Sequence, residues 1–206
     1  MPVDPQIQIL LDKATGVPAT HTLPVDTART QYEAPVALMA PPADIASVRE
    51  RVIDGLGGPL HIRIYTPHGM GPFPLLVFFH GSGFVLCSLE THDGMCRNLC
   101  ARAGCVVASV DYRLAPEYKV PAGIDDCLHP TRWAAAHAAE LGANAMRVAV
   151  AGDSAGANMR SPIMRSAAAL PGDGLPHARH SLIREKRRGL RTHSRYDEVV
   201  LGALFE

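Results

Sequence analysis

The sequence GDSAG at residues 152–156 places a serine between small residues, directly after an apolar run. It matches the G-x-S-x-G pattern, in which a serine occupies a sharp turn from a strand into a helix. A serine hydroxyl is a weak nucleophile unless a histidine accepts its proton and an acid orients that histidine. The pattern therefore predicts acyl-transfer chemistry at Ser154, with a structural serine in a glycine-rich helix start as the alternative.

A second glycine-rich segment, HGSGF at residues 80–84, follows the apolar run at residues 75–79. Because glycine has no side chain, such a loop can bring backbone N–H groups close to a developing oxyanion. The alternative is a plain glycine-rich turn. Phosphate binding is disfavoured, because neither a following Gly-Lys-Ser/Thr nor the G-x-G-x-x-G spacing is present.

A metal site has to be considered at His92, Cys96 and Cys100, which are spaced four apart and would share one helical face. Only three ligands are available there, without a paired C-x-x-C, and free cysteine commonly packs as a small hydrophobic residue. We therefore expect packing rather than metal, and no cofactor. The odd number of cysteines, five, together with the absence of an export signal, predicts reduced thiols.

Composition limits the possible partners. The chain has 206 residues, of which 47% are hydrophobic and 19% charged, and its formal net charge is zero. These values fit one globular domain with a small appendage. A net charge of zero gives no long-range electrostatic attraction to nucleic acid or to an anionic membrane. No apolar run is long enough to span a bilayer, and the N-terminus lacks the features of a secretory signal. We expect a cytoplasmic protein with neither partner; the oligomeric state is not indicated.

The elements that must position Ser154 alternate along the chain. The first pair of extended segments is joined by turn residues and predicts a hairpin, whereas the later segments are unbroken apolar runs typical of strands covered on both faces. The five predicted strands are residues 48–53, 60–65, 75–79, 105–110 and 147–151. Helices are expected at residues 93–103 and 121–141, ending before Gly104 and Gly142. This alternation predicts an α/β fold with a mostly parallel sheet and flanking helices.

The first 45 residues form a separate segment in this interpretation. Asp4 is a suitable N-cap and Pro5 a suitable first residue for a short helix that runs to Asp12. The following residues, as far as Pro42, are rich in proline, alanine and threonine and predict little regular structure.

Three motifs occur in a fixed order: HGSGF at residues 80–84, YRLAPE at residues 112–117 and GDSAG at residues 152–156. Together they resemble the hormone-sensitive-lipase-like branch of the α/β-hydrolases, which includes many bacterial carboxylesterases. The resemblance runs from the N-terminus to about Asn158 or Met159. It implies a partial α/β-hydrolase fold, with an N-terminal cap segment at residues 1–45, a core at 46–160 and a divergent basic tail at 161–206.

The resemblance also implies a function and a site. The chain would be a carboxylic ester hydrolase acting on short-chain acyl esters, with Ser154 as the nucleophile and no cofactor. The backbone N–H groups of Gly81, Ser82 and Ala155 would form the oxyanion hole. Ser82 stands where the family usually has glycine, and residues 112–117 would brace the loop beneath the site.

The tail does not continue the family pattern, in which an acid and then a histidine follow the serine on later strands. Between residues 179 and 195 it has seven basic residues against the single acid Glu185: Arg179, Arg184, Lys186, Arg187, Arg188, Arg191 and Arg195. We therefore expect a change of reading frame near Arg160 or Ser161, loss of the acid and the histidine, a poorly ordered tail and impaired catalysis.

Three alternatives to an ester hydrolase with impaired catalysis remain open. The first is a non-catalytic hydrolase-like module that binds acyl ligands or a protein partner. The second is association with nucleic acid through the basic residues. The third is a substitute dyad drawn from the histidines and aspartates of the tail, which are His177, His180, His193, Asp173 and Asp197.

Overall fold

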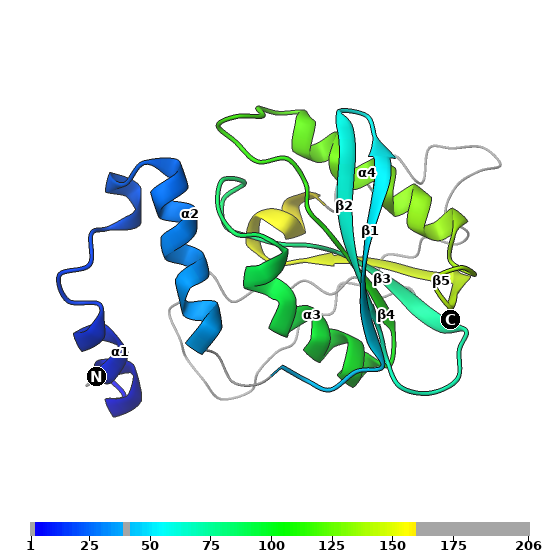
Figure 1. Ribbon diagram of the computed structural model, residues 1–206, viewed down its shortest axis with the longest axis horizontal. Helices are drawn as coiled ribbons and strands as arrows, with labels where there is room; N and C mark the ends of the chain where they lie inside the picture. Colours follow the sequence, from blue (N-terminus) through cyan, green and yellow to red (C-terminus); the bar gives the residue numbers. More distant parts are fainter. Residues whose placement is uncertain (1–2, 39–41, 160–206) are drawn as a thin grey trace.

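The computed structural model describes residues 3–38 and 42–159, in which a five-stranded sheet is flanked by helices (Figure 1). All five predicted strands are present, in the spatial order β1-β2-β4-β3-β5. They are β1 (Ser47–Gly55), β2 (Gly58–Thr66), β3 (Phe73–Phe79), β4 (Val106–Val110) and β5 (Ala143–Gly152). The division predicted at residue 45 stays a prediction, and the first strand begins at Ser47.

The sheet is mixed. β1 and β2 form the expected antiparallel hairpin, closed where Gly55 pairs with Gly58, and β2 is antiparallel to β4. β3 lies between β4 and β5 and runs parallel to both. The parallel expectation thus holds for the three strands next to the candidate site. Because Phe79 at the end of β3 pairs with Gly152 at the end of β5, the two glycine-rich motifs leave the sheet side by side.

The helices α3 (Leu89–Ala103) and α4 (Ala122–Ala136) cover opposite faces of the sheet. Side chains of β3 alternate between two core clusters. Leu75 and Val77 belong to the cluster that contains Cys127 of α4, whereas Phe78 belongs to the cluster that contains Cys96 of α3. β3 is therefore buried on both faces, as its unbroken apolar run predicts.

Element boundaries differ from the expected ones for local reasons. α3 begins four residues early, at Leu89, because the N–H of Ser88 donates to Thr91 Oγ1 at 3.0 Å and caps the helix start. α4 ends at Ala136 and β5 begins at Ala143, so the predicted helix is too long and the predicted strand too short. Between them the chain turns through Gly142, whose φ of 71° belongs to the left-handed region.

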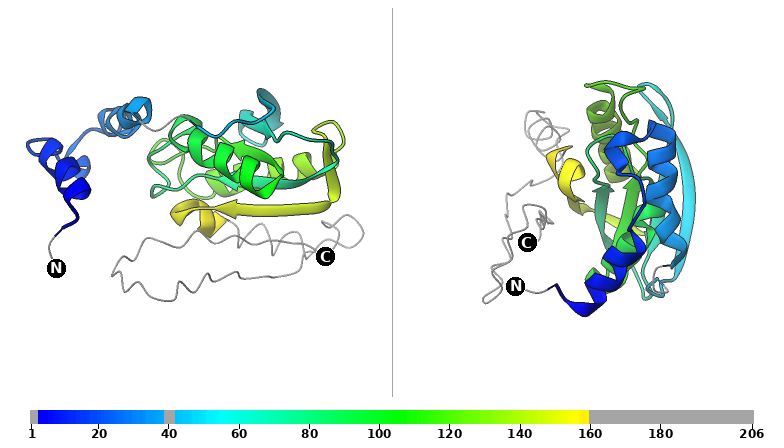
Figure 2. Two further views of the ribbon diagram at one scale, coloured as in Figure 1. Left: turned by 90° about the horizontal axis from the view of Figure 1, so that it is seen from below. Right: turned by 90° about the vertical axis from the view of Figure 1, so that its left-hand side faces the viewer.

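The N-terminal segment contains more helix than its sequence predicts. α1 (Pro5–Lys13) was expected, but α2 (Val25–Glu33) and the short 3₁₀ helices η1 (Thr20–Thr22) and η2 (Ala34–Leu38) were not. α1 lies away from the sheet, and α2 lies between α1 and the sheet with its flanking helices (Figure 2).

Long-range hydrogen bonds explain α2. Arg29 donates to both carboxylate oxygens of Glu117 at 2.8 Å, to Val85 O at 2.9 Å and to Ala115 O at 3.0 Å. Most helical stability in proteins comes from tertiary contacts rather than from propensity. A helix held in this way by one arginine leaves no local signal in the sequence.

The two edges of the sheet are unlike. β1 carries four exposed charged side chains: Arg49, Glu50, Arg51 and Asp54. β5 pairs only with β3 among residues 3–38 and 42–159, and its last five residues, Val148 to Gly152, are buried. All five cysteines are free thiols, as expected. Within the described part of the chain, no helix has the length and apolar character needed to cross a membrane.

Candidate active site

Ser154 occupies the turn that follows β5. It has a φ of 46°, which is unusual for a residue other than glycine, and it is exposed. The glycines on either side allow this turn to pack against the end of β3. A Cβ at Gly152 would lie 2.5 Å from Phe79 O, and a Cβ at Gly156 only 1.9 Å from the same atom. The strained, exposed serine and its glycine neighbours have the local geometry that G-x-S-x-G predicts.

The loop at residues 80–84 is tied to this turn. The N–H of Gly81 donates to Asp153 Oδ1 at 2.8 Å, and a Cβ at Gly81 would lie 2.2 Å from Asp153 Oδ2. Only glycine therefore allows the carboxylate to approach so closely. Ser82, next in the loop, has a φ of 84°, a conformation that favours the glycine usual at this position in the family.

The structure brings the predicted residues Ser154, Gly81, Ser82 and Ala155 to one end of the sheet, but their N–H groups are not equivalent. The N–H of Gly81 is already used by Asp153. Among the residues that the structure describes, no acceptor is bonded to the N–H of Ser82 or Ala155. Within the described residues, the N–H groups of Ser82 and Ala155 are thus unbonded, whereas the N–H of Gly81 already has a partner.

His80 and Tyr112 support the loop from below. The Tyr112 hydroxyl donates to His80 O at 2.7 Å, and the two rings are stacked with their centroids 4.6 Å apart. This contact agrees with the bracing role implied for residues 112–117. His80 is fully buried, and burial lowers its pKa to about 4 despite the bond between its Nδ1 and Gly81 O. The ring is therefore neutral at physiological pH.

The neutral His80 predicts a loss of stability in acid. Its pKa is 6.5 when exposed and about 4 in the folded chain, so between these values the unfolded chain binds the proton and the folded chain does not. The free energy of unfolding is therefore highest above pH 6.5. It decreases by on the order of 3 kcal/mol as the pH falls towards 4. Urea unfolding of the wild type and His80→Gln from pH 7.5 to 4 measures it. The wild type should show the steeper decrease; parallel curves would contradict a buried neutral imidazole.

Asp153 and His92 form a contact that the motifs do not predict. His92 Nε2 lies 3.2 Å from Asp153 Oδ1. Burial alone would raise the pKa of Asp153, but the hydrogen bonds from His92 and Gly81 outweigh burial and lower it. Asp153 could have been suspected as the variable residue of the G-x-S-x-G motif, whereas nothing in the sequence pairs it with His92.

The other members of the spaced triplet at His92 lie in the core. Cys96 and Cys100 are fully buried, and burial raises the pKa of each thiol to about 12. Both thiols therefore stay protonated and pack as apolar groups at neutral pH.

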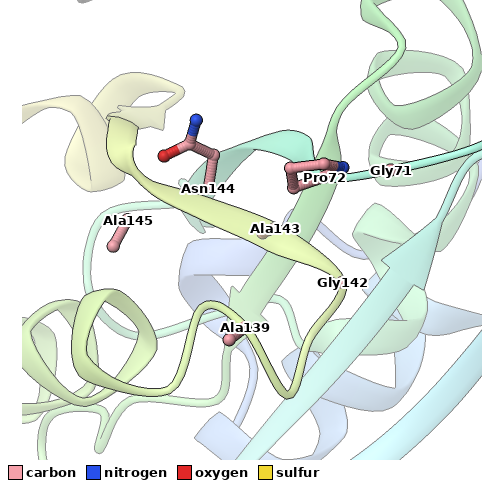
Figure 3. A pocket seen from close by; sticks show the side chains of 7 residues that line it. All are labelled: Gly71, Pro72, Ala139, Gly142, Ala143, Asn144 and Ala145. Atoms are coloured by element: carbon pink, nitrogen blue, oxygen red, sulfur yellow. The ribbon is translucent and has the colours of Figure 1, made fainter.

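A surface pocket of about 500 Å³ lies at the other end of the sheet. Its lining comes from the residues before β3, the turn after α4 and the start of β5: Gly71, Pro72, Ala139, Gly142, Ala143, Asn144 and Ala145 (Figure 3). Ser154 follows the opposite end of β5. The pocket is thus separate from the candidate active site.

A base for Ser154 is not found in the described part of the chain. Within residues 3–38 and 42–159, no hydrogen bond joins the Ser154 hydroxyl to a histidine. The tail residues considered as a substitute dyad lie outside the described residues, as does the predicted change of reading frame. These are His177, His180, His193, Asp173 and Asp197.

Comparisons with known proteins agree with the fold and the motifs. The family model described as alpha/beta hydrolase fold matches residues 76–178, beyond the point near Met159 where the motif resemblance ends. Carboxylesterase NlhH of Mycobacterium tuberculosis is 42% identical over 164 residues, which are 76% of this chain and 49% of NlhH. An arylesterase of Saccharolobus solfataricus is 36% identical over 162 residues, covering 77% of this chain and 53% of the relative.

A solved structure extends the agreement to three dimensions. The hyperthermophilic esterase of the archaeon Pyrobaculum calidifontis superposes with a TM-score of 0.75 at 41% identity, covering 82% of this chain and 55% of that chain. The chain thus spans about half the length of these relatives. The matched model, the sequence identities and the shared architecture lead to one conclusion: the chain belongs to the α/β-hydrolase family, in its hormone-sensitive-lipase-like branch of esterases.

Proposed function

We propose that this chain carries the nucleophile and the oxyanion hole of a carboxylic ester hydrolase. The observation that carries the proposal is Ser154, exposed on a strained turn beside a loop that is hydrogen-bonded to the same turn. The relatives named esterase or carboxylesterase support the reaction class. A small acyl ester is the proposed substrate; absence of cofactor, membrane and nucleic-acid partners and a cytoplasmic location stay predictions.

In the proposed reaction, Ser154 Oγ attacks the ester carbonyl carbon and its proton passes to a base. The N–H groups of Ser82 and Ala155 stabilise the oxyanion of the tetrahedral intermediate. The C–O bond to the alcohol then breaks, the alcohol takes up the proton, and water hydrolyses the acyl-serine ester. Since no histidine of the described residues is bonded to Ser154, the base has to come from outside them.

Labelling with an organophosphonate p-nitrophenyl ester tests the nucleophile. Any phosphonyl group that mass spectrometry finds in the digested chain should be on Ser154, because among the serines that the structure describes only this one combines exposure with a strained turn. Ser154→Ala should remove the label. Ser88→Ala, which removes a surface hydroxyl bonded to Glu33, should keep it. Label on another serine, or equal labelling of Ser154→Ala, would refute the assignment.

A further inference from the structure

The Asp153 carboxylate connects three segments of the chain. Its Oδ1 accepts the N–H of Gly81 at 2.8 Å and lies 3.2 Å from His92 Nε2. An ionised carboxylate only accepts hydrogen bonds, so both nitrogens must carry the shared protons. One oxygen atom therefore joins the turn after β5, the loop after β3 and helix α3.

We propose that His92 and Asp153 form a positioning pair that holds the oxyanion loop, residues 80–83, against the turn of Ser154. This inference rests on the proposed function, because loop position affects ester hydrolysis only if Ser154 is the nucleophile. The Asp153 oxygen that faces the loop is bonded to Gly81 rather than directed at Ser154. Both members of the pair are positioning residues that act through Gly81.

His92 is itself firmly held. Only 8% of its surface is exposed, and its Nδ1 lies 2.9 Å from Oγ1 of Thr91, the residue whose side chain caps α3. Its ring centroid lies 5.5 Å from that of His80 and 6.1 Å from that of Phe78. The imidazole is thus fixed by a helix that packs on the sheet, and residues on such rigid elements set geometry more accurately than residues on loops.

The bond to Gly81 gains strength from charge. The lowered pKa of Asp153 keeps its carboxylate ionised at neutral pH, and hydrogen bonds to an ionised acceptor are about twice as strong as neutral ones. His92 donates to the same oxygen and so fixes the direction in which the carboxylate points. Without His92, the carboxylate is free to rotate towards solvent, and the loop loses its anchor.

An amide measurement on the intact chain tests this anchor independently of catalysis. Labelling histidine with ¹³C at the carbonyl and glycine with ¹⁵N selects His-Gly pairs, of which the sequence has His68-Gly69 and His80-Gly81. In His92→Ala, the Gly81 amide proton should shift upfield and exchange faster with solvent, while the Gly69 amide serves as an internal control. Phosphonylation of Ser154 should slow by about 10–100-fold, the effect of misplacing a catalytic group by about 1 Å.

A conservative variant separates positioning from packing. His92→Gln provides an amide N–H that can donate to Asp153, and it should recover most of the Gly81 shift and of the labelling rate. His21→Ala, in the exposed η1, should match the wild type in both measurements. An unmoved Gly81 amide in His92→Ala, or a His92→Gln variant as impaired as His92→Ala, would overturn the proposal.

Two other results need a separate interpretation: a His92→Ala variant that does not fold, and the absence of label on Ser154. If His92→Ala does not fold, Asp153→Asn keeps the side-chain shape without the charge, and its Gly81 amide should again move upfield; an unmoved amide overturns the proposal. If Ser154 is not phosphonylated even when the residues beyond 159 are replaced by the part of carboxylesterase NlhH that lies beyond its matched half, which would supply the base, the proposed function fails. The Gly81 amide measurements in His92→Ala and His92→Gln then still decide whether the pair anchors the loop.

Discussion

Replacing Ser154 by alanine should lower kcat for p-nitrophenyl acetate by about 10⁶-fold in a chimaera with a complete catalytic apparatus. The chimaera joins residues 1–159 of this chain to the part of carboxylesterase NlhH that lies beyond its matched half. The loss is large because alanine removes the proposed nucleophile, whereas the proposed oxyanion donors, the N–H groups of Ser82 and Ala155, stay in place. Steady-state hydrolysis, followed by p-nitrophenolate release, measures the effect.

The unmodified 206-residue chain is the matched control for this chimaera. It should hydrolyse the same ester several orders of magnitude more slowly, because no histidine of its described residues is bonded to Ser154. An unmodified chain as fast as the chimaera would contradict this expectation. If that activity were lost in both Ser154→Ala and His193→Ala, the residues beyond 159 would supply the base.

Gly156→Ala should destabilise the folded chain by about 3 kcal/mol or more, near the upper range for a single substitution. The added Cβ would lie 1.9 Å from Phe79 O and 2.8 Å from His80 O, both of which are backbone atoms. Relief requires the end of β3 to move away from the turn of Ser154. Urea unfolding followed by circular dichroism measures the free energy, and the same displacement should abolish phosphonylation of Ser154.

Gly94→Ala provides the matched control for this substitution. Gly94 lies inside α3 at a position where a Cβ would meet no atom within 4 Å apart from its chain neighbours and the backbone of its own helix. The replacement should leave the free energy of unfolding unchanged or raise it by up to about 1 kcal/mol, since alanine favours helix over glycine. Equal stability of Gly156→Ala and the wild type would mean that the turn does not pack against β3 as described.

Much of the core is predictable from local patterns. The hairpin follows from alternation and glycine turns, and β3 and β4 follow from unbroken apolar runs. The candidate site is predictable because its motifs occupy strand ends: once β3 and β5 are parallel neighbours, Gly81 and Ser154 have to meet. In the structure, Phe79 at the end of β3 pairs with Gly152 at the end of β5, which places the two motifs side by side.

What the sequence does not predict depends on contacts between distant segments. α2 has no strong local signal because Arg29 bonds to residues that lie far along the chain, such as Val85 and Glu117. The use of the Gly81 N–H by Asp153 is hidden for the same reason. A motif states which backbone donors are near the serine, but only the three-dimensional arrangement determines which donor already has a partner.

The two edge strands of the sheet, β1 and β5, differ in how well they can pair with a further strand. Charged side chains on an edge strand, such as Arg49 and Glu50 of β1, disfavour pairing with a further strand, whereas the last five residues of β5 are small or apolar and uncharged. A further strand is therefore expected to pair with β5 rather than with β1. Because the turn of Ser154 leaves the same strand, a strand that paired with β5 would lie beside the candidate active site.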